Sequence, residues 1–227
     1  MLINRVILYS NALEEMKEFY VRILGFRLLH SNEIRFSIQV GESELEFRKN
    51  DLTTKKPFYH FAFNIPSNRF SEAKKWARNK VVLNIEDGVD EIYFPRSHAH
   101  SFYFMDPSGN IVEFISRHSI SPESNEPFSV HSILNMSEMS LTTNQVLAVG
   151  EQLIDFGILV NKKGKLNEEF NFMGESGVYI LLGKTGRRWL FSHLNAEVHP
   201  LMIEIDREKR VEVTEDGKVS LCKVKNE

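Results

Sequence analysis

A glutamate in the middle of an apolar segment is the first group in this sequence that could do chemistry. Glu113 lies in IVEFIS, residues 111–116, between Val112 and Phe114. An ionised carboxylate buried among such side chains is unfavourable unless a cation, a hydrogen-bond donor or a metal ion compensates it. We therefore expect a partner for Glu113 elsewhere in the chain.

The segment that carries Glu113 is predicted to be the second strand of a β-hairpin. Two β-rich segments flank DPSGN, residues 106–110. Pro107 presets the backbone for the first central position of a type I turn, and Gly109 can adopt the left-handed conformation that closes a bulged hairpin. The hairpin therefore spans residues 98–116.

The order of predicted elements recurs along the chain. Residues 2–48 predict a strand, a helix and three strands, with the helix over 12–24 ending at Gly25. Residues 58–117 predict the same order, including a short strand at 82–85. Self-similarity of this kind indicates repeated structural modules.

Two pairs of aligned segments support the repeat. ELEF at 44–47 aligns with IVEF at 111–114, so Glu46 matches Glu113. RVILYS, which begins at Arg5, aligns with HFAFNI, which begins at His60. Because side chains alternate across a strand, each of these polar groups is expected on the face opposite its large apolar neighbours.

The second half of the chain is predicted to be a degenerate copy of the first. Residues 118–132 are rich in Ser, Pro and Asn, a composition typical of linkers. A third module begins near Ile133 with a strand, in which Glu138 has no evident partner, and a helix over 144–156. A strand is predicted at 188–191, and further strands complete the chain to residue 227.

Composition excludes several classes of function. With 28 Lys and Arg against 31 Asp and Glu, the net charge is -3, so a basic nucleic-acid surface is not expected. The single cysteine, Cys222, excludes an intrachain disulfide and fits a reducing cytoplasm. No apolar stretch is long enough for a membrane span. The expected location is therefore cytoplasmic.

Paired βαβββ modules with a DPxGNxxEF hairpin, together with the phrase FYVRILGF at 19–26, resemble the vicinal oxygen chelate superfamily. That superfamily includes glyoxalase I, bleomycin- and fosfomycin-resistance proteins, and extradiol dioxygenases. The resemblance implies an α+β fold in which repeated βαβββ modules form cupped mixed β-sheets around a divalent metal ion. It covers residues 1–117 as a paired glyoxalase-like domain, followed by the linker at 118–132 and the degenerate part at 133–227.

Carried over residue by residue, the resemblance implies His60, Glu113 and Glu46 as metal ligands. One imidazole and two carboxylates around open positions suit Fe(II), Mn(II) or Zn(II). Arg5 stands where the superfamily has His or Gln. Either Arg5 replaces the metal by pairing with Glu46 and Glu113, or it turns toward a substrate anion.

Other polar residues have two interpretations each. Tyr103 matches a position of the extradiol dioxygenase signature, where Tyr assists a bound catechol, but it also suits cross-strand packing. His98 and His100 flank the hairpin at the expected mouth of the cup, where they could relay protons or be solvated. Arg187, followed by Arg188 and Trp189, could clamp an anion or form an exposed edge.

Two hypotheses of function follow. In the first, the chain is a metal-dependent glyoxalase- or dioxygenase-type enzyme that acts on a small substrate with vicinal oxygens, with Tyr103 and Arg5 as catalytic residues. In the second, it is a metal-free module that binds or sequesters a small molecule, with Arg5 in the metal position. Neither involves nucleic acid or a membrane, and pairing of two chains as a homodimer is left open.

Overall fold

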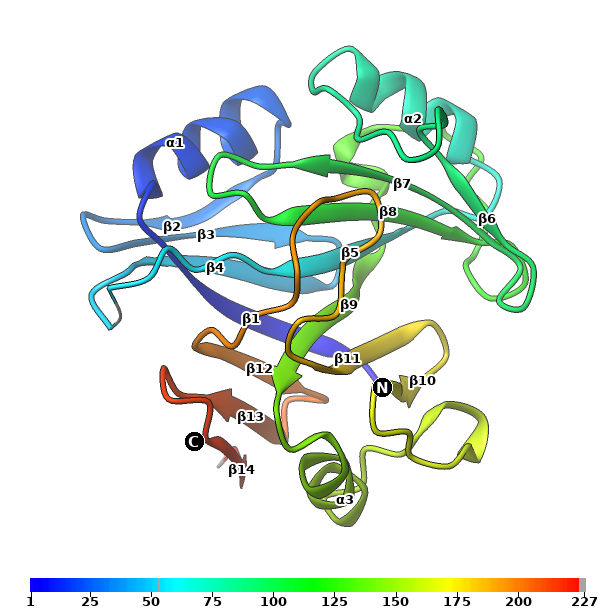
Figure 1. Ribbon diagram of the computed structural model, residues 1–227. Helices are drawn as coiled ribbons and strands as arrows, with labels where there is room; N and C mark the ends of the chain where they lie inside the picture. The colour runs from blue at the N-terminus through cyan, green and yellow to red at the C-terminus, as the bar shows by residue number, and fades with distance from the viewer. Residues whose placement is uncertain (53, 225–227) are drawn as a thin grey trace.

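The computed structural model describes residues 1–52 and 54–224, and all of the described strands belong to one hydrogen-bonded network (Figure 1). The first module consists of β1 (Ile3–Ser10), α1 (Leu13–Lys17), β2 (Leu28–Ser31), β3 (Arg35–Val40) and β4 (Ser43–Lys49). A π-helical turn, Glu18–Ile23, continues α1. The second module consists of β5 (His60–Ile65), α2 (Phe70–Arg78), β6 (Ile92–Phe94), β7 (Ala99–Met105) and β8 (Ile111–Arg117).

The second half of the chain contributes a shorter third module and three further strands. The third module consists of β9 (Asn135–Thr143), α3 (Val146–Asp155), β10 (Phe170–Glu175) and β11 (Val178–Lys184). The C-terminal strands are β12 (Leu201–Ile205), β13 (Lys209–Val213) and β14 (Val219–Lys223). The predicted α+β class with repeated modules is confirmed. No helix among the described residues is both long and apolar enough to cross a bilayer.

The first strands of the modules pair in an order that differs from our expectation. We expected the first two modules to face each other, but β1 pairs antiparallel with β12 and β5 pairs antiparallel with β9. In the sheet, β9 lies between β1 and β5. The apolar pattern of a strand does not encode which neighbour joins its free edge, so sequence periodicity alone could not distinguish these pairings.

Two predicted strands are wrong. Residues 82–85 form only one bridge, between Leu83 and Phe104, and residues 188–191 form only one, between Arg188 and Asn195. The latter segment turns back at Phe191, whose φ is +54°. The aromatic side chains there are buried against other strands rather than alternating across a ladder.

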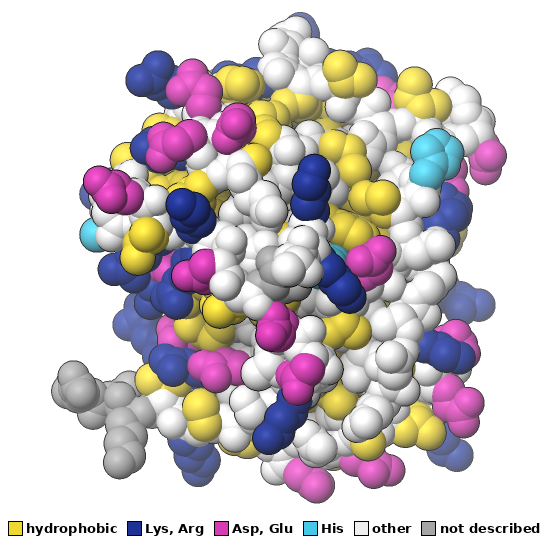
Figure 2. Space-filling model, turned by 60° about the vertical axis from the view of Figure 1, so that its left-hand side comes forward, with side chains coloured by type: hydrophobic (Ala, Val, Ile, Leu, Met, Phe, Trp, Pro, Cys, Tyr) yellow, Lys and Arg dark blue, Asp and Glu magenta, His cyan; other side chains and the backbone are white. Residues whose placement is uncertain are grey.

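Alternation along the strands creates two apolar layers. On β8, Val112 and Phe114 belong to the main core, whereas Ile111 belongs to a second cluster that includes Tyr103 and Trp189. Figure 1 shows α1 and α2 at one end of the view and α3 at the other. On the face shown in Figure 2, Lys and Arg side chains are interspersed with Asp and Glu, as the small net charge suggests.

The predicted hairpin forms, and its turn is tied to the first module. The Asp106 carboxylate accepts hydrogen bonds from the backbone N–H groups of Ser108 and Asn110, both at 3.0 Å, and from the Tyr20 hydroxyl at 2.8 Å. Burial raises the pKa of Asp106 to about 6, although these hydrogen bonds oppose the rise. Gly109 adopts a φ of +82°. The turn thus holds two modules in a fixed relation.

Gly41 provides a test of how the first module meets β9. Its φ is +55°, and a Cβ there would overlap the backbone carbonyl of Leu134, which accepts a hydrogen bond of 2.9 Å from the Glu42 N–H. Gly41→Ala should therefore lower the free energy of unfolding by about 3 kcal/mol or more. The matched control is Gly88→Ala. Gly88 also has a positive φ, +80°, but a Cβ added there would have no neighbour within 4 Å. It should cost about 1 kcal/mol. Equal losses in urea denaturation would contradict this account.

Candidate metal centre

His60 begins β5 with its side chain buried on the inner face of the sheet, where it is 5% exposed. Its Nδ1 lies 3.0 Å from the carbonyl oxygen of Ile111. A carbonyl only accepts hydrogen bonds, so Nδ1 carries the proton and Nε2 keeps its lone pair when the ring is neutral. Nε2 lies 3.4 Å from Oε2 of Glu113. His60 is therefore oriented as a metal ligand would be.

Glu113 is buried at 3% exposure, as its apolar neighbours predicted. Ser101 Oγ donates a hydrogen bond of 2.5 Å to its Oε1, which leaves Oε2 directed toward His60. Tyr103 lies opposite Glu113 on β7 and is 3% exposed. Burial and the charges of Glu113 and Glu138 raise the pKa of Tyr103 well above its usual value, so the phenol stays protonated.

Glu138, in the middle of β9, is the third acidic group and is 5% exposed. It forms an ion pair with Arg117, whose guanidinium also donates to Ser137 Oγ at 3.1 Å. Burial raises the pKa of Glu138, and the charge of Glu113 raises it further, while Arg117 opposes both effects. The net shift is upward, with burial as its largest cause.

Strand register explains why these three side chains meet. Ala62 on β5 lies opposite Glu113 of β8 and opposite Glu138 of β9. His60, two residues earlier, projects from the same face. Between the two carboxylates lies only the methyl side chain of Ala62. One ligand atom from each of His60, Glu113 and Glu138 lies within 4.8 Å of the others.

The chemistry of these donors fits a divalent cation. Two buried carboxylates lie beside an imidazole with a free lone pair, and Arg117 pairs with one of them, Glu138. An ion held by one nitrogen and two carboxylate oxygens would remove the remaining excess of negative charge. Three protein ligands also leave positions open for a substrate.

The three side chains lie on the wall of a cavity of about 740 Å³. This volume is in the range of small-molecule sites. Much of the remaining wall is aromatic, contributed by Phe94, Tyr103, Phe170, Phe172, Tyr179 and Trp189. Such a cavity suits a flat, apolar ligand with a few oxygens.

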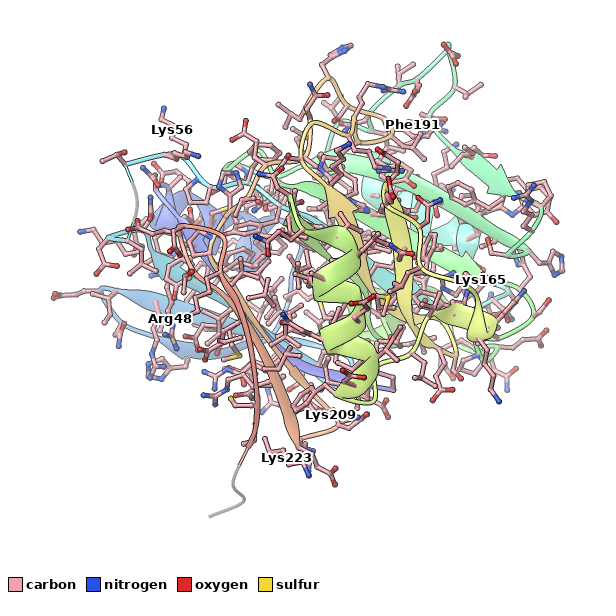
Figure 3. The ribbon with its side chains drawn as sticks, turned by 60° about the horizontal axis from the view of Figure 1, so that its bottom comes forward. Arg48, Lys56, Lys165, Phe191, Lys209 and Lys223 are labelled. Carbon is pink, nitrogen blue, oxygen red and sulfur yellow. The ribbon has the colours of Figure 1, made fainter. Side chains whose placement is uncertain are left out.

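The segment between β11 and β12 closes one side of this cavity. Its Trp189 ring lies 4.8 Å from the His60 ring, and its Phe191 ring stacks on Tyr103 at 4.7 Å, with 13° between the planes. Glu86 pairs with Arg188 and accepts a hydrogen bond from the Phe191 N–H, which fixes the segment to the second module. Figure 3 labels Phe191 on this segment.

Glu46 and Arg5 do not join this cluster, contrary to our expectation. The Arg5 guanidinium pairs with Glu46, which also accepts from Arg48 Nε at 2.5 Å. Burial disfavours the charge on Glu46, but hydrogen bonds from Arg48 and Arg5 outweigh it and hold its pKa below the usual value. Arg5 and Arg48 line a separate cavity of about 480 Å³. In Figure 3, Arg48 lies far from Phe191.

The first module nevertheless repeats the positions of the second. Ile7 lies opposite Glu46 of β4 and opposite Met202 of β12, just as Ala62 lies between Glu113 and Glu138. Arg5 therefore corresponds to His60, but an isoleucine and a methionine replace the alanine and the second glutamate. The alignment of the modules was sound, whereas the expectation that they face each other was not.

Sequence reasoning missed Glu138 as a member of the group. It recognised the residue as an acid in the middle of a strand, the same signal that singled out Glu113, but assigned it no partner. Only the antiparallel pairing of β5 with β9 brings it beside His60. The ligand assignments of His60 and Glu113 stay predictions.

The histidines of the hairpin lie outside the group. His98 lines the rim of the cavity, and His100 Nδ1 lies 2.7 Å from His118 Nε2. Burial lowers the pKa of His100, and the neighbouring His118 lowers it further. Within the described residues, this pair of histidines makes no direct contact with His60 through which it could relay a proton.

Two family models match parts of the chain. The Glyoxalase/Bleomycin resistance protein/Dioxygenase superfamily model matches residues 2–114, and the Toxoflavin-degrading enzyme model matches residues 136–187. No curated protein sequence matches the chain.

Two solved structures illustrate what the chain is similar to. A candidate dioxygenase from Bacillus subtilis superposes with a TM-score of 0.56 and 16% identity, over 81% of this chain and 63% of that chain. A lactoylglutathione lyase from Agrobacterium tumefaciens is 20% identical, with a TM-score of 0.41, over 49% of this chain and 90% of that chain. At 16% identity the likeness to the Bacillus subtilis protein is one of fold alone.

Metal content tests the group of His60, Glu113 and Glu138 directly. The wild type should bind about one equivalent of Mn(II), and His60→Ala or Glu138→Gln should weaken binding by about 100-fold or more. Because the pKa of Glu138 is raised, protons compete with the metal for this carboxylate, so metal affinity should fall as the pH is lowered. Calorimetric titration measures both effects.

Glu46→Gln is the matched control, because Glu46 holds the corresponding position of the first module. It should retain wild-type affinity. If Glu46→Gln lost the metal while Glu138→Gln kept it, the centre would lie in the other cavity.

Proposed function

Because residues 2–114 match the model of the Glyoxalase/Bleomycin resistance protein/Dioxygenase superfamily, we propose that the chain is a metal-dependent enzyme acting on a small substrate with two neighbouring oxygens. The observation that carries the proposal is the buried group of His60, Glu113 and Glu138 on the wall of the 740 Å³ cavity. Proteins of the superfamily typically bind a divalent metal.

In this proposal the three side chains hold Fe(II), Mn(II) or Zn(II), with Arg117 orienting Glu138. The ion supplies Lewis acidity toward the two oxygens of the substrate. Ser101 and the carbonyl of Ile111 fix the orientations of Glu113 and His60 through the hydrogen bonds described above. Ligands held in this way need little reorganisation when the metal and the substrate bind.

Tyr103 has the role of a hydrogen-bond donor in this proposal. Its hydroxyl is buried next to Glu113 and stays protonated, since its pKa is raised well above the usual value. A neutral phenol in this position can donate to a substrate oxygen on which negative charge develops. Arg5 has no part in this site in the proposal, because it lines the other cavity.

Trp189 and Phe191 exclude water from the reacting groups in this proposal. Both side chains are 5% exposed and cover the inner wall beside His60 and Tyr103. Removal of water strengthens electrostatic interactions between the site and a charged reacting group.

The match at residues 136–187 favours one more specific activity. The matched family is named for degradation of toxoflavin, and this stretch contains Glu138, Tyr179, Leu181 and Arg187, which line the cavity. We propose toxoflavin and related small molecules as the first substrates to test, beside catechols and hemithioacetals.

A metal-free binding protein is the competing proposal. The observation in its favour is the ion pair between Arg117 and Glu138, which already compensates one of the two carboxylates. It predicts ligand binding without turnover and no stoichiometric metal. The metal titration above separates the two proposals.

Activity of the loaded protein tests the proposed enzyme. Protein reconstituted with Mn(II), Fe(II) or Zn(II) should turn over at least one of these substrates, and His60→Ala should lower kcat/KM by about 100-fold or more. Tyr103→Phe should lower kcat by about 100-fold with a smaller change in KM, because its hydroxyl acts on developing charge.

Glu46→Gln again provides the control and should keep full activity. Intact activity in a His60→Ala/Glu113→Ala double variant would contradict the proposal, whatever metal is present.

A further inference from the structure

Arg187 presents a cationic side chain to the cavity without an acidic partner. It lies just after β11, is half-buried and lines the same cavity as His60. Among residues 1–52 and 54–224, no carboxylate forms an ion pair with its guanidinium. The adjacent Arg188, by contrast, points to Glu86 and pairs with it. A half-buried guanidinium without a counter-ion is unfavourable unless a ligand supplies one.

Aromatic rings hold the Arg187 guanidinium in place. Its Cζ lies 4.0 Å from the centroid of the Phe170 ring and 5.3 Å from that of Trp189. Burial and the nearby charge of Arg188 lower the pKa of Arg187, but an arginine in this environment remains protonated. The backbone is fixed as well, since the Arg187 carbonyl accepts a 2.7 Å hydrogen bond from the Ala196 N–H.

The charges on the cavity wall favour an anionic ligand. Glu113 and Glu138 are the acidic residues among those that line it, and both are directed to the candidate metal centre. Arg96 and Lys162 also line the wall, and in the described part of the chain neither forms an ion pair. With a divalent ion bound, the cavity would carry a clear excess of positive charge.

The distance between the two ends of the cavity sets the size of the ligand. The indole of Trp189 contacts the His60 ring at 4.8 Å and the Arg187 guanidinium at 5.3 Å. The His60 ring and the Arg187 guanidinium are therefore no more than about 10 Å apart, a span that one fused aromatic ring system can bridge. The aromatic walls described above suit a flat molecule of that size.

We propose that Arg187 binds the anionic oxygen group of a planar aromatic substrate, at the end of the molecule remote from the metal, and so sets the charge specificity of the cavity. This inference rests on the proposed function in taking the cavity as the substrate site. Recognition of the anion itself uses the planar, multiply donating guanidinium and does not require the metal.

Calorimetric titration with a matched pair of probes tests this role. Naphthalenesulfonate carries a negative charge but is a poor metal ligand, and naphthalenesulfonamide has nearly the same shape without the charge. The wild-type protein loaded with Mn(II) should bind the sulfonate about 10-fold or more tightly than the sulfonamide. Arg187→Met should bind both alike, with wild-type affinity for the sulfonamide.

Two further variants sharpen the test. Arg187→Lys keeps the charge but loses the planar fork, so its preference for the sulfonate should lie between those of wild type and Arg187→Met. Arg22→Met, which alters an exposed arginine of the first module outside the cavity, should keep the wild-type preference.

An undiminished preference for the sulfonate in both Arg187 variants, or no preference in the wild type, would overturn the inference. Metal content measured on the same samples distinguishes this failure from that of the proposed function. Either of these two results, obtained with one equivalent of bound metal, counts against the role of Arg187 alone. An Arg187-dependent preference in protein that binds no metal supports the anion site and counts against the metal-dependent enzyme.

Discussion

The burial of two carboxylates beside one imidazole is the constraint on which the rest of this site depends. Glu113 and Glu138 lie on either side of Ala62, in a part of the sheet from which water is largely excluded. Two such groups cannot both stay ionised there without compensation. Arg117 provides part of it, and a divalent ion on His60 and the two glutamates would provide the rest.

Strand pairing between modules, rather than any single module, brings the two carboxylates and the imidazole together. β8 is parallel to β5, and β9 is antiparallel to it, so each contributes one glutamate to the face that carries His60. The first module and β12 repeat the arrangement with Arg5, Ile7 and Met202 in the corresponding positions. There, arginines compensate Glu46. The same arrangement of strands thus encloses an aromatic cavity where β5 pairs with β8 and β9. It encloses an ion-paired network where β1 pairs with β4 and β12.

The sequence allowed the modules, the hairpin turn and the burial of Glu113 to be predicted, because each depends on local periodicity or turn chemistry. It did not allow the partner of β5 to be predicted, and that pairing decides whether Glu46 or Glu138 lies beside His60. The same limit applies to Trp189. Its segment was expected to be a strand, but contacts with His60 and Glu86, distant in sequence, determine its course.

The most direct test of the central claim is a crystal structure of the protein soaked in Mn(II), with anomalous diffraction recorded at the manganese edge. The account predicts one strong anomalous peak within about 2.0–2.3 Å of His60 Nε2 and of an oxygen from each of Glu113 and Glu138. A peak beside Glu46 instead, or no peak while Arg117 remains paired with Glu138, would contradict it.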